Sequence, residues 1–181
     1  MRRKLSMHEL NRKSVEEFKL AKKNPFVIVL DNVRSQNNIG SIFRTADAFL
    51  AEAVILCGIT SIPPNKEIHK TALGATESVR WEYLENTMDA VTRLKKEGYI
   101  IICLEQAENS FSLAVFHPEP GKKYALVFGN EVHGVSQEIV DACDLCVEIP
   151  QYGTKHSLNI AVSAGIAVWE FNKQLATGTM R

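Results

Sequence analysis

The 181-residue sequence has no apolar run long enough to cross a membrane, and its start, Met1 to Leu5, lacks the apolar stretch of a secretory signal. It shows no internal repeat and no low-complexity tract. Basic and acidic residues are equal in number, so there is no overall basic excess to indicate a nucleic-acid partner. With 45% hydrophobic residues, the chain can form one globular domain with a sizeable core. We expect a cytoplasmic protein.

The sequence has only four cysteines, which could form disulfide bridges. Cys57 and Cys103 lie in apolar runs that are typical of buried strands, where a free thiol behaves as a small hydrophobe. Cys143 and Cys146 have the spacing of half a zinc site or of a redox pair, but no second pair accompanies them. We therefore expect reduced thiols and predict no metal.

Charge is distributed unevenly despite the balanced total. Residues 1–25 carry eight Lys or Arg and three Glu, whereas the rest of the chain carries 13 basic and 18 acidic residues. A basic N-terminal arm on an acidic body suits contact with RNA phosphates. A solvated surface helix explains the same charges equally well.

Local signals divide the chain. Ser6 to Glu9 and Ser14 to Glu17 both match the capping-box pattern, which predicts two short helices or one interrupted helix. Asn24-Pro25 ends this arm, since the residue before proline disfavours the helical region. We expect a basic helical arm over residues 1–25, one domain over residues 26–176 and a frayed tail over residues 177–181.

Short apolar runs alternate with helical patterns along the main domain. The runs predict buried strands at Phe26–Leu30, Ala53–Cys57, Tyr99–Leu104, Lys123–Phe128 and Leu145–Ile149, and a more exposed strand at Val79–Leu84. Helices are expected at about 41–50, 67–74, 87–97 and 137–142. This alternation predicts an α/β fold with a mostly parallel sheet flanked by helices.

The stretch from Val147 to Ile166 is predicted to form a strand, a polar loop and a helix of small and apolar residues. On this helix the near-helical spacing of five residues predicts one buried face, made of Leu158, Val162, Gly165, Ile166 and Trp169. The polar loop before it is suited to a ligand site, although an ordinary connection between strand and helix explains it equally well.

Polar loops follow the strands that end at Leu30, Leu104, Phe128 and Ile149, and in a parallel sheet these loops meet at one edge, where ligands bind. The first loop offers Asn37 and Asn38 and, one turn into the next helix, Arg44. This arginine is suited to gripping a phosphate, but a surface or interface salt bridge is its commoner role.

The third loop has two glycines, Gly129 and Gly134, on either side of Asn130, Glu131 and His133. Its backbone can therefore approach a ligand closely while a carboxylate points toward it. The loop lacks the Gly-Lys-Ser/Thr of a nucleotide-binding P-loop, and its glycines are too sparse for a dinucleotide fingerprint. Nucleoside triphosphate hydrolysis and standard Rossmann binding are disfavoured.

Ser157 lies next to His156, but it lacks the Gly-x-Ser-x-Gly setting of a serine hydrolase. Neighbouring residues on a chain seldom face each other in the way that nucleophile and base require. A hydrolase is therefore disfavoured.

Three motifs together resemble those of the SpoU, or TrmH-like, RNA 2′-O-methyltransferases of the SPOUT superfamily. They are Asn37-Asn-Ile-Gly-Ser-Ile-Phe-Arg-Thr-Ala46, Leu126-Val-Phe-Gly-Asn-Glu-Val-His-Gly-Val-Ser136 and Ile149-Pro-Gln-Tyr-Gly-Thr-Lys-His-Ser-Leu-Asn-Ile-Ala-Val-Ser163. Their order and spacing match as well. The resemblance covers about Phe26 to Lys173, and His69 to Ala75 also looks like a segment of this family.

The resemblance implies a SPOUT fold whose C-terminal part forms a deep trefoil knot, a threading that is rare among proteins. It also implies a homodimer with residues of both subunits at each site, and S-adenosylmethionine bound in a bent form, mainly by backbone groups of the knotted loops. By position, the residues expected to bind this cofactor are Leu104, Gly129, Asn130, Ile149, Ser157 and Leu158.

The implied reaction moves a sulfonium methyl group to a ribose 2′-hydroxyl of tRNA or rRNA, which requires alignment and removal of a proton. Arg44 matches the family's catalytic arginine. A guanidinium is a poor base, so we favour phosphate gripping and stabilisation of the developing alkoxide, with water or phosphate taking the proton. The resemblance assigns orienting roles to Asn38, Glu131, Ser157 and Asn159, and no metal is required.

Two alternatives remain at this point: a SPOUT enzyme that methylates an RNA base, and a non-catalytic RNA-binding protein on the same scaffold. For the dimer, small and apolar residues of the last helix would allow close approach of two helices, although an intramolecular core explains them equally well. These residues are Ala161, Ala164, Ala167 and Val168.

Overall fold

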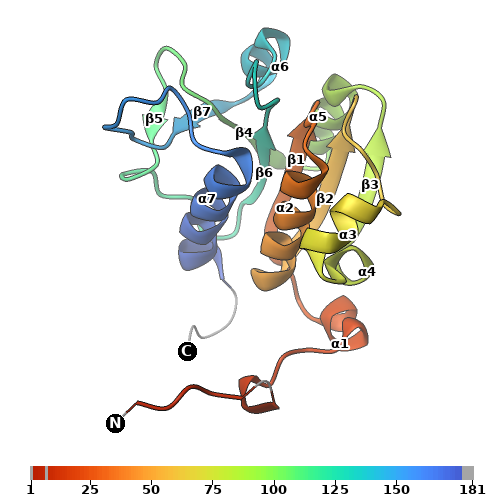
Figure 1. Ribbon diagram of the computed structural model, residues 1–181. Coiled ribbons are helices and arrows are strands. Elements are labelled where there is room, and N and C mark those ends of the chain that lie inside the picture. The colour runs from red at the N-terminus through yellow and green to blue at the C-terminus, as the bar shows by residue number, and fades with distance from the viewer. Residues whose placement is uncertain (1, 7, 177–181) are drawn as a thin grey trace.

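The fold is built on one parallel sheet (Figure 1). The computed structural model describes residues 2–6 and 8–176, and within them seven strands form a sheet of order β3-β2-β1-β6-β4-β7-β5. All paired strands run parallel. The strands are β1 Asn24–Asp31, β2 Ala51–Cys57, β3 Trp81–Leu84, β4 Tyr99–Leu104, β5 Phe111–Ser112, β6 Lys123–Phe128 and β7 Leu145–Glu148. The predicted α/β architecture is confirmed.

Helices cover both faces of the sheet. In the same described residues they are a single 3-10 turn at His8–Leu10, then α1 Val15–Leu20, α2 Gln36–Ala48, α3 Lys66–Ala72, α4 Ala75–Ser78, α5 Thr87–Lys96, α6 Gln137–Ala142 and α7 Ile160–Leu175. One hydrophobic cluster joins the sheet to α2, α3, α4 and α7, and a second joins the opposite face to α5 and α6.

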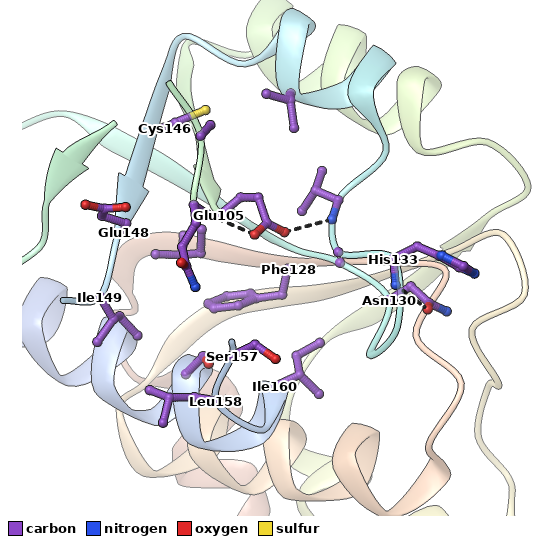
Figure 2. Close-up of a pocket in the computed structure, with 18 of the residues that line it drawn as sticks. Glu105, Phe128, Asn130, His133, Cys146, Glu148, Ile149, Ser157, Leu158 and Ile160 are labelled. Atoms are coloured by element: carbon purple, nitrogen blue, oxygen red, sulfur yellow. Dashed lines mark hydrogen bonds between the residues drawn. The ribbon is translucent and has the colours of Figure 1, made fainter. Parts of the chain in front are cut away.

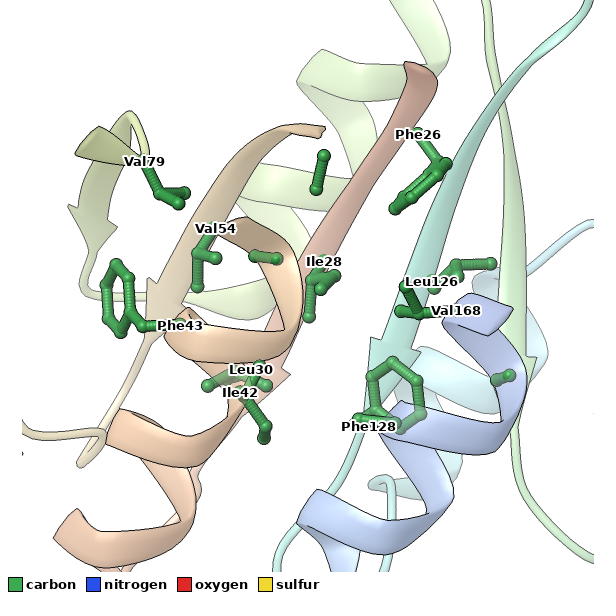
Figure 3. Packing of buried hydrophobic residues seen from close by; sticks show 14 of the residues in the cluster. Phe26, Ile28, Leu30, Ile42, Phe43, Val54, Val79, Leu126, Phe128 and Val168 are labelled. Atoms are coloured by element: carbon green, nitrogen blue, oxygen red, sulfur yellow. The ribbon is translucent and has the colours of Figure 1, made fainter. Parts of the chain in front are cut away.

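The central strand β1 shows why both faces are covered. Phe26, Ile28 and Leu30 belong to the cluster under α2 and α7, whereas Val27 and Val29 belong to the cluster under α5. All five side chains are at most 1% exposed. Figure 3 shows the first set with Leu126 and Phe128 of β6 and Val168 of α7. The continuous apolar run is therefore a strand buried on both faces, as predicted.

The state of the cysteines and the absence of a membrane-spanning helix in the described residues can be compared with the predictions from composition. Cys57 and Cys103 are fully buried in β2 and β4, as predicted, and all four cysteines, each within the described residues, are free thiols. Among the helices of the described residues, none combines the length and apolarity needed to span a membrane.

The N-terminal arm ends two residues earlier than predicted. Asn24 already belongs to β1, where its N–H donates to Leu50 O at 2.9 Å. Pro25 has no N–H to donate, and the pairing of β1 with β2 is irregular between Asn24 and Val27. Proline at a strand start thus interrupts one bond without ending the strand. The predicted tail at 177–181 lies outside the described residues.

Of the two predicted capping boxes, the one at Ser14 to Glu17 is confirmed, and the one at Ser6 to Glu9 forms only in part. Ser14 and Glu17 form the reciprocal pair of bonds that begins α1. Ser6 donates from its N–H and its hydroxyl to Glu9 at 2.8 Å, at a turn too short to be an α-helix. Phe18 of α1 is 4% exposed and belongs to the core, so α1 is anchored, while the segment before it extends away from the sheet (Figure 1).

Helix α2 begins five residues before the predicted start. The side chain of Ser35 accepts from Asn38 N–H at 3.3 Å and caps the helix, which then begins at Gln36. Asn37 and Asn38, predicted in a loop, therefore occupy the first turn of α2. The fixed helical geometry determines where the Asn38 amide points, as the site shows.

The predicted buried face of α7 is wrong. Leu158, Val162, Ile166 and Trp169 are 37%, 50%, 40% and 47% exposed. The buried face consists instead of Ile160, Ala164, Ala167, Val168 and Phe171, all at most 7% exposed. Because α7 is apolar on most of its circumference, periodicity alone could not distinguish the two faces. The face that packs on the sheet is the one whose small residues allow close approach. Ala164, Ala167 and Val168 are therefore part of the intramolecular core, which was the alternative to a dimer contact.

Candidate functional site

A cavity of about 1180 Å³ opens at the carboxyl ends of β4, β6 and β7. The loops after these three strands form its walls, and the first turn of α7 closes one side (Figure 2). All six residues predicted to bind the cofactor line it, together with Glu131 and Asn159: Leu104, Gly129, Asn130, Ile149, Ser157 and Leu158. The predicted convergence of loops at one sheet edge is confirmed.

The loop after β6 forms a closed hairpin. Asn130 and Gly134 exchange two backbone hydrogen bonds, of 2.9 and 2.8 Å. The Asn130 side-chain oxygen accepts from the N–H groups of Val132 and His133. A side chain at Gly129 would meet the Gly134 carbonyl carbon at 2.1 Å, so only glycine fits here. The hairpin therefore presents backbone to the cavity in a fixed geometry.

Glu105 is a cavity residue that the sequence analysis missed. Its carboxylate accepts from Gln106 N–H at 2.9 Å and from Val135 N–H at 3.1 Å, which ties the loop after β4 to the loop after β6 (Figure 2). Its position directly after the end of β4 was an available signal. No motif marked it, because the partner N–H groups come from a distant loop.

Three predicted catalytic residues form one hydrogen-bonded network. The Asn159 amide donates to the Asn38 oxygen at 3.1 Å, and the Asn38 amide donates to Glu131 at 3.1 Å. Glu131 also accepts from the N–H groups of Arg34 and Ser35 at 3.0 and 2.9 Å. The network thus joins the β1–α2 loop, the hairpin after β6 and the start of α7.

Charge is stabilised at Glu131 by these donors. Partial burial alone would raise its pKa, but hydrogen bonds from the N–H groups of Arg34, Ser35 and Glu131 itself and from the Asn38 amide outweigh burial, and the pKa is lowered. Glu131 is therefore an ionised acceptor at neutral pH. It orients the Asn38 amide and, through it, Asn159.

Asn159 has a second role as the N-cap of α7. Its side-chain oxygen accepts from the N–H groups of Ala161 and Val162 at 2.9 and 3.4 Å. The same amide thus begins the helix and donates to Asn38. The helix start and the network are fixed relative to each other by one side chain.

Arg44 and Ser157 stand apart from the network. Arg44 is exposed on α2 and does not line the cavity, and Ser157 lines it as an exposed residue. Within the described part of the chain neither side chain has a hydrogen bond or ion pair. The structure therefore brings together Asn38, Glu131 and Asn159, but it does not bring Arg44 to them.

The cavity is suited to a small cation with polar groups. Its carboxylates are Glu105, Glu108, Glu131, Asp141 and Glu148, and among the described residues that line it none is Lys or Arg. A sulfonium and an ammonium group are favoured by such a field. The cavity also exceeds the roughly 300–1,000 Å³ of ordinary small-molecule pockets. The cavity is thus large enough for S-adenosylmethionine, and its carboxylates suit the sulfonium and ammonium groups of that cofactor.

A metal ion has no comparable set of ligands. Among the described residues, no group of three or more His, Cys, Asp or Glu side chains is arranged to hold one.

Comparison with known proteins identifies the family. The model of the SpoU rRNA methylase family matches residues 25–169, which include the sheet, the cavity and most of α7. The chain belongs to the SpoU rRNA methylase family. Membership implies the knotted C-terminal arrangement that the sequence motifs predict.

Relatives of this SpoU family chain include RNA methyltransferases. An uncharacterized tRNA/rRNA methyltransferase of Borreliella burgdorferi is 32% identical over 161 residues, which are 89% of this chain and 69% of that protein. The 23S rRNA (guanosine-2′-O-)-methyltransferase RlmB of Neisseria meningitidis is 33% identical over 150 residues, 83% of this chain and 59% of that protein. The chain thus spans 59% to 69% of the length of these relatives.

Solved structures of the SpoU family share the fold. The AdoMet-bound rRNA methyltransferase of Sinorhizobium meliloti has a TM-score of 0.79 at 29% identity and covers 86% of this chain, which spans 59% of that one. The TrmH/SpoU tRNA modifying enzyme of A. aeolicus has a TM-score of 0.78 at 28% identity, with 88% and 80% coverage. The predicted fold class is confirmed.

Proposed function

We propose that this chain is an S-adenosylmethionine-dependent methyltransferase that acts on a ribose 2′-hydroxyl of tRNA or rRNA. The observation that carries the proposal is the acidic cavity bounded by all six predicted cofactor residues, with the Asn38–Glu131–Asn159 network at its edge. The relative in Neisseria meningitidis is named for this chemistry, and the structure from Sinorhizobium meliloti is described as AdoMet-bound.

Backbone groups would hold the cofactor. The hairpin from Gly129 to Gly134 and the segments at Leu104 and Ile149 line the cavity, and the two glycines leave the hairpin backbone uncovered by side chains. When bound, S-adenosylmethionine supplies an electrophilic methyl group. The protein then has to orient the ribose and exclude water, which fixed backbone and a pre-formed network do without reorganisation.

The other predicted residues would act on the RNA. Arg44 would grip a phosphate of the substrate and stabilise the developing alkoxide, with water or phosphate taking the proton. Asn38, Glu131 and Asn159 would orient the ribose, and Ser157 would face the reacting atoms. The absence of any partner for Arg44 and Ser157 within the described residues supports these roles, because both side chains are available to a substrate.

Calorimetry and a methyl-transfer assay test this function. We expect S-adenosylmethionine to bind the wild-type protein, and label from the cofactor to appear in total RNA from a strain that lacks the protein. Nuclease-resistant dinucleotides in the product would identify ribose methylation, whereas digestible product would favour a base methyltransferase. Cofactor binding without transfer to any RNA would favour the non-catalytic alternative, and no cofactor binding would exclude the proposal.

We also propose a homodimer, supported by the exposed apolar face of α7. Val162, Ile166 and Trp169 form this face, with Leu158 just before the helix, and the Trp169 ring also packs on Phe49 at 5.8 Å between centroids. Such a continuous apolar strip on one helix is typical of an interface. A dimer through this face would bring residues of both copies toward each cavity, as the family resemblance implies.

Trp169→Glu tests the dimer. The wild-type protein is expected to sediment as a dimer at micromolar concentration, and the variant as a monomer, because a buried carboxylate opposes association. Val115→Glu is the matched control, since Val115 is 71% exposed but lies in the loop after β5. A monomeric wild type would contradict the dimer. Selection of the RNA by the basic arm and a cytoplasmic location remain predictions.

A further inference from the structure

Asp31 is a buried carboxylate that the proposed chemistry does not use. It lies at the carboxyl end of β1, is 1% exposed and does not line the cavity. A buried carboxylate without partners is costly, so its hydrogen bonds show what holds it there.

Three donors from three different segments surround Asp31. Its Oδ1 accepts from the hydroxyl of Thr87 at 2.6 Å and from the side-chain amide of Asn32 at 2.8 Å. Its Oδ2 accepts from the backbone N–H of Ser136 at 3.2 Å. Asp31 thus joins the end of β1 to the first residue of α5 and to the N-cap of α6.

The Ser136 bond reaches the wall of the cavity. Ser136 follows the hairpin that closes with Gly134, and Gly134 and Val135 both line the cavity. The neighbour of Asp31 holds the other end of this hairpin, because the Asn130 amide donates to Asn32 O at 2.8 Å. Two successive residues of β1 and its loop therefore hold both ends of the segment from Asn130 to Ser136.

We propose that Asp31 is a positioning residue that sets the affinity for the cofactor from behind the cavity wall. This inference rests on the proposed function, since it takes the cavity as the S-adenosylmethionine site. Asp31 touches neither cofactor nor RNA. It fixes the position of the Gly134–Ser136 backbone from behind the cavity, while Glu105 fixes the same backbone from the cavity side through Val135 N–H.

A positioning role predicts a particular division of effects. Loss of the Asp31–Ser136 bond frees the hairpin wall, so cofactor affinity falls, while the Asn38–Glu131–Asn159 network keeps its own bonds. The turnover rate at saturating cofactor therefore stays near that of the wild type. A merely structural role would instead lower the fraction of folded, active protein without changing the affinity of the rest.

Ser136→Pro removes the donor and puts the proline ring Cδ in its place, directed at the Asp31 carboxylate. Ser136 has φ −61° and ψ 146°, which proline adopts without strain, and its hydroxyl makes no cap hydrogen bond. Ser136→Ala keeps the N–H and is the matched control. Asp31→Asn changes the acceptor: in either amide orientation, its NH₂ faces the N–H of Ser136 or the amide of Asn32. Thr87→Val removes a donor on the α5 side and leaves the Ser136 bond intact.

Calorimetric titration with S-adenosylmethionine and amide hydrogen exchange of residues 129–136 provide the measurements. We expect Ser136→Pro to weaken cofactor binding about tenfold and to exchange faster over this segment. Asp31→Asn should weaken binding less, because one orientation of its amide keeps an oxygen facing the N–H of Ser136. Ser136→Ala and Thr87→Val should bind within about twofold of the wild type, since neither breaks the Ser136 bond.

Equal cofactor affinity in Ser136→Pro and the wild type would overturn the proposal, and so would an equal loss in Ser136→Ala. Should Asp31→Asn fail to fold, Ser136→Pro still decides. If the wild type itself binds no cofactor, the proposed function fails separately. Hydrogen exchange then decides whether Asp31 positions the segment 129–136. Unchanged exchange of this segment in Ser136→Pro would overturn the positioning role.

Discussion

The candidate site has two parts that differ in how far they are assembled. Asn38, Glu131 and Asn159 are joined by hydrogen bonds of 3.1 Å and fixed to three segments of the fold. Arg44 and Ser157 are exposed and, in the part of the chain that the structure describes, have no such bonds. The first part forms as the protein folds, whereas in our proposal the second gains its partners from a substrate. Changes in the first should cost stability and activity together, and changes in the second activity alone.

Arg44→Ala should have the largest effect on activity. Without the guanidinium, nothing in our proposal stabilises the developing alkoxide, and the turnover rate should fall about 10²- to 10³-fold. The melting temperature should not change, because the side chain holds no part of the fold. Single-turnover methyl transfer and thermal unfolding measure the two effects.

Arg80→Ala is the control for Arg44→Ala, since Arg80 is also exposed and its only ion pair in the described residues, with Glu52, is long at 3.8 Å. Arg44→Lys keeps the charge but loses the bidentate fork, and it should recover only part of the rate. A large fall in melting temperature for Arg44→Ala would mean that Arg44 also stabilises the fold, and the two parts of the site would then not differ in this respect. Undiminished transfer would remove Arg44 from its role.

Glu131→Gln should have the next largest effect and should cost stability as well. The amide NH₂ of glutamine would face the N–H of Arg34 or Ser35, so one hydrogen bond is replaced by two opposed donors. We expect a loss of about 1–3 kcal/mol in the free energy of unfolding and about tenfold in turnover. Glu108→Gln is the control, because Glu108 is an exposed carboxylate of the same cavity. Full stability in Glu131→Gln would show that the network is not pre-assembled.

The pH dependence of stability sharpens the same comparison. The folded-state pKa of Glu131 lies below its ordinary value of 4.5, so its contribution is complete above pH 4.5 and is lost as the pH falls through the folded-state pKa. The difference in melting temperature between wild type and Glu131→Gln should therefore be constant near neutrality and shrink below pH 4.5. Other carboxylates titrate in both proteins and cancel in the difference.

Most of the fold could be predicted from local pattern. The strands at Tyr99–Leu104 and Lys123–Phe128 and the helix at Gln137–Ala142 have the predicted bounds, because their apolar runs end at clear polar or glycine signals. The two-residue strand β5 was missed, since Phe111 and Ser112 carry no strand pattern of their own. It exists because the loop after β4 pairs with β7.

The site residues were predicted mainly from the family motifs, and less from the physical properties of the sequence. Loop convergence follows from a parallel sheet, but the choice of Asn38 and Asn159 came from the family resemblance. Their contact spans 121 positions of the chain, and no local signal encodes it. The same limit explains why Glu105 and Asp31 were missed: each accepts from backbone N–H groups, which every residue carries except proline.

Asn159 gives the smallest and most discriminating effect, because one side chain belongs to the network and to the start of α7. Asn159→Ala removes both roles and should cost about 1 kcal/mol of stability, the usual value of an N-cap. Asn159→Asp keeps the cap, since aspartate accepts from Ala161 and Val162 N–H as well as asparagine does. It loses only the donor to Asn38.

In Asn159→Asp two carboxylates, the one introduced at position 159 and that of Glu131, compete for the single NH₂ of Asn38. The Asn38 amide has two possible orientations. If its NH₂ turns to the introduced carboxylate, the Asn38 oxygen faces Glu131. If its NH₂ stays on Glu131, the Asn38 oxygen faces the introduced carboxylate, so in both cases two acceptors face each other. Methyl transfer should therefore fall a few-fold, and the melting temperature should fall less than in Asn159→Ala, because the cap is kept and the opposed contact is exposed to solvent. Asn159→Ser, which caps without donating an amide, should behave in the same way. A fall in melting temperature equal to that of Asn159→Ala would mean that the Asn38 contact, and not the cap, stabilises the start of α7.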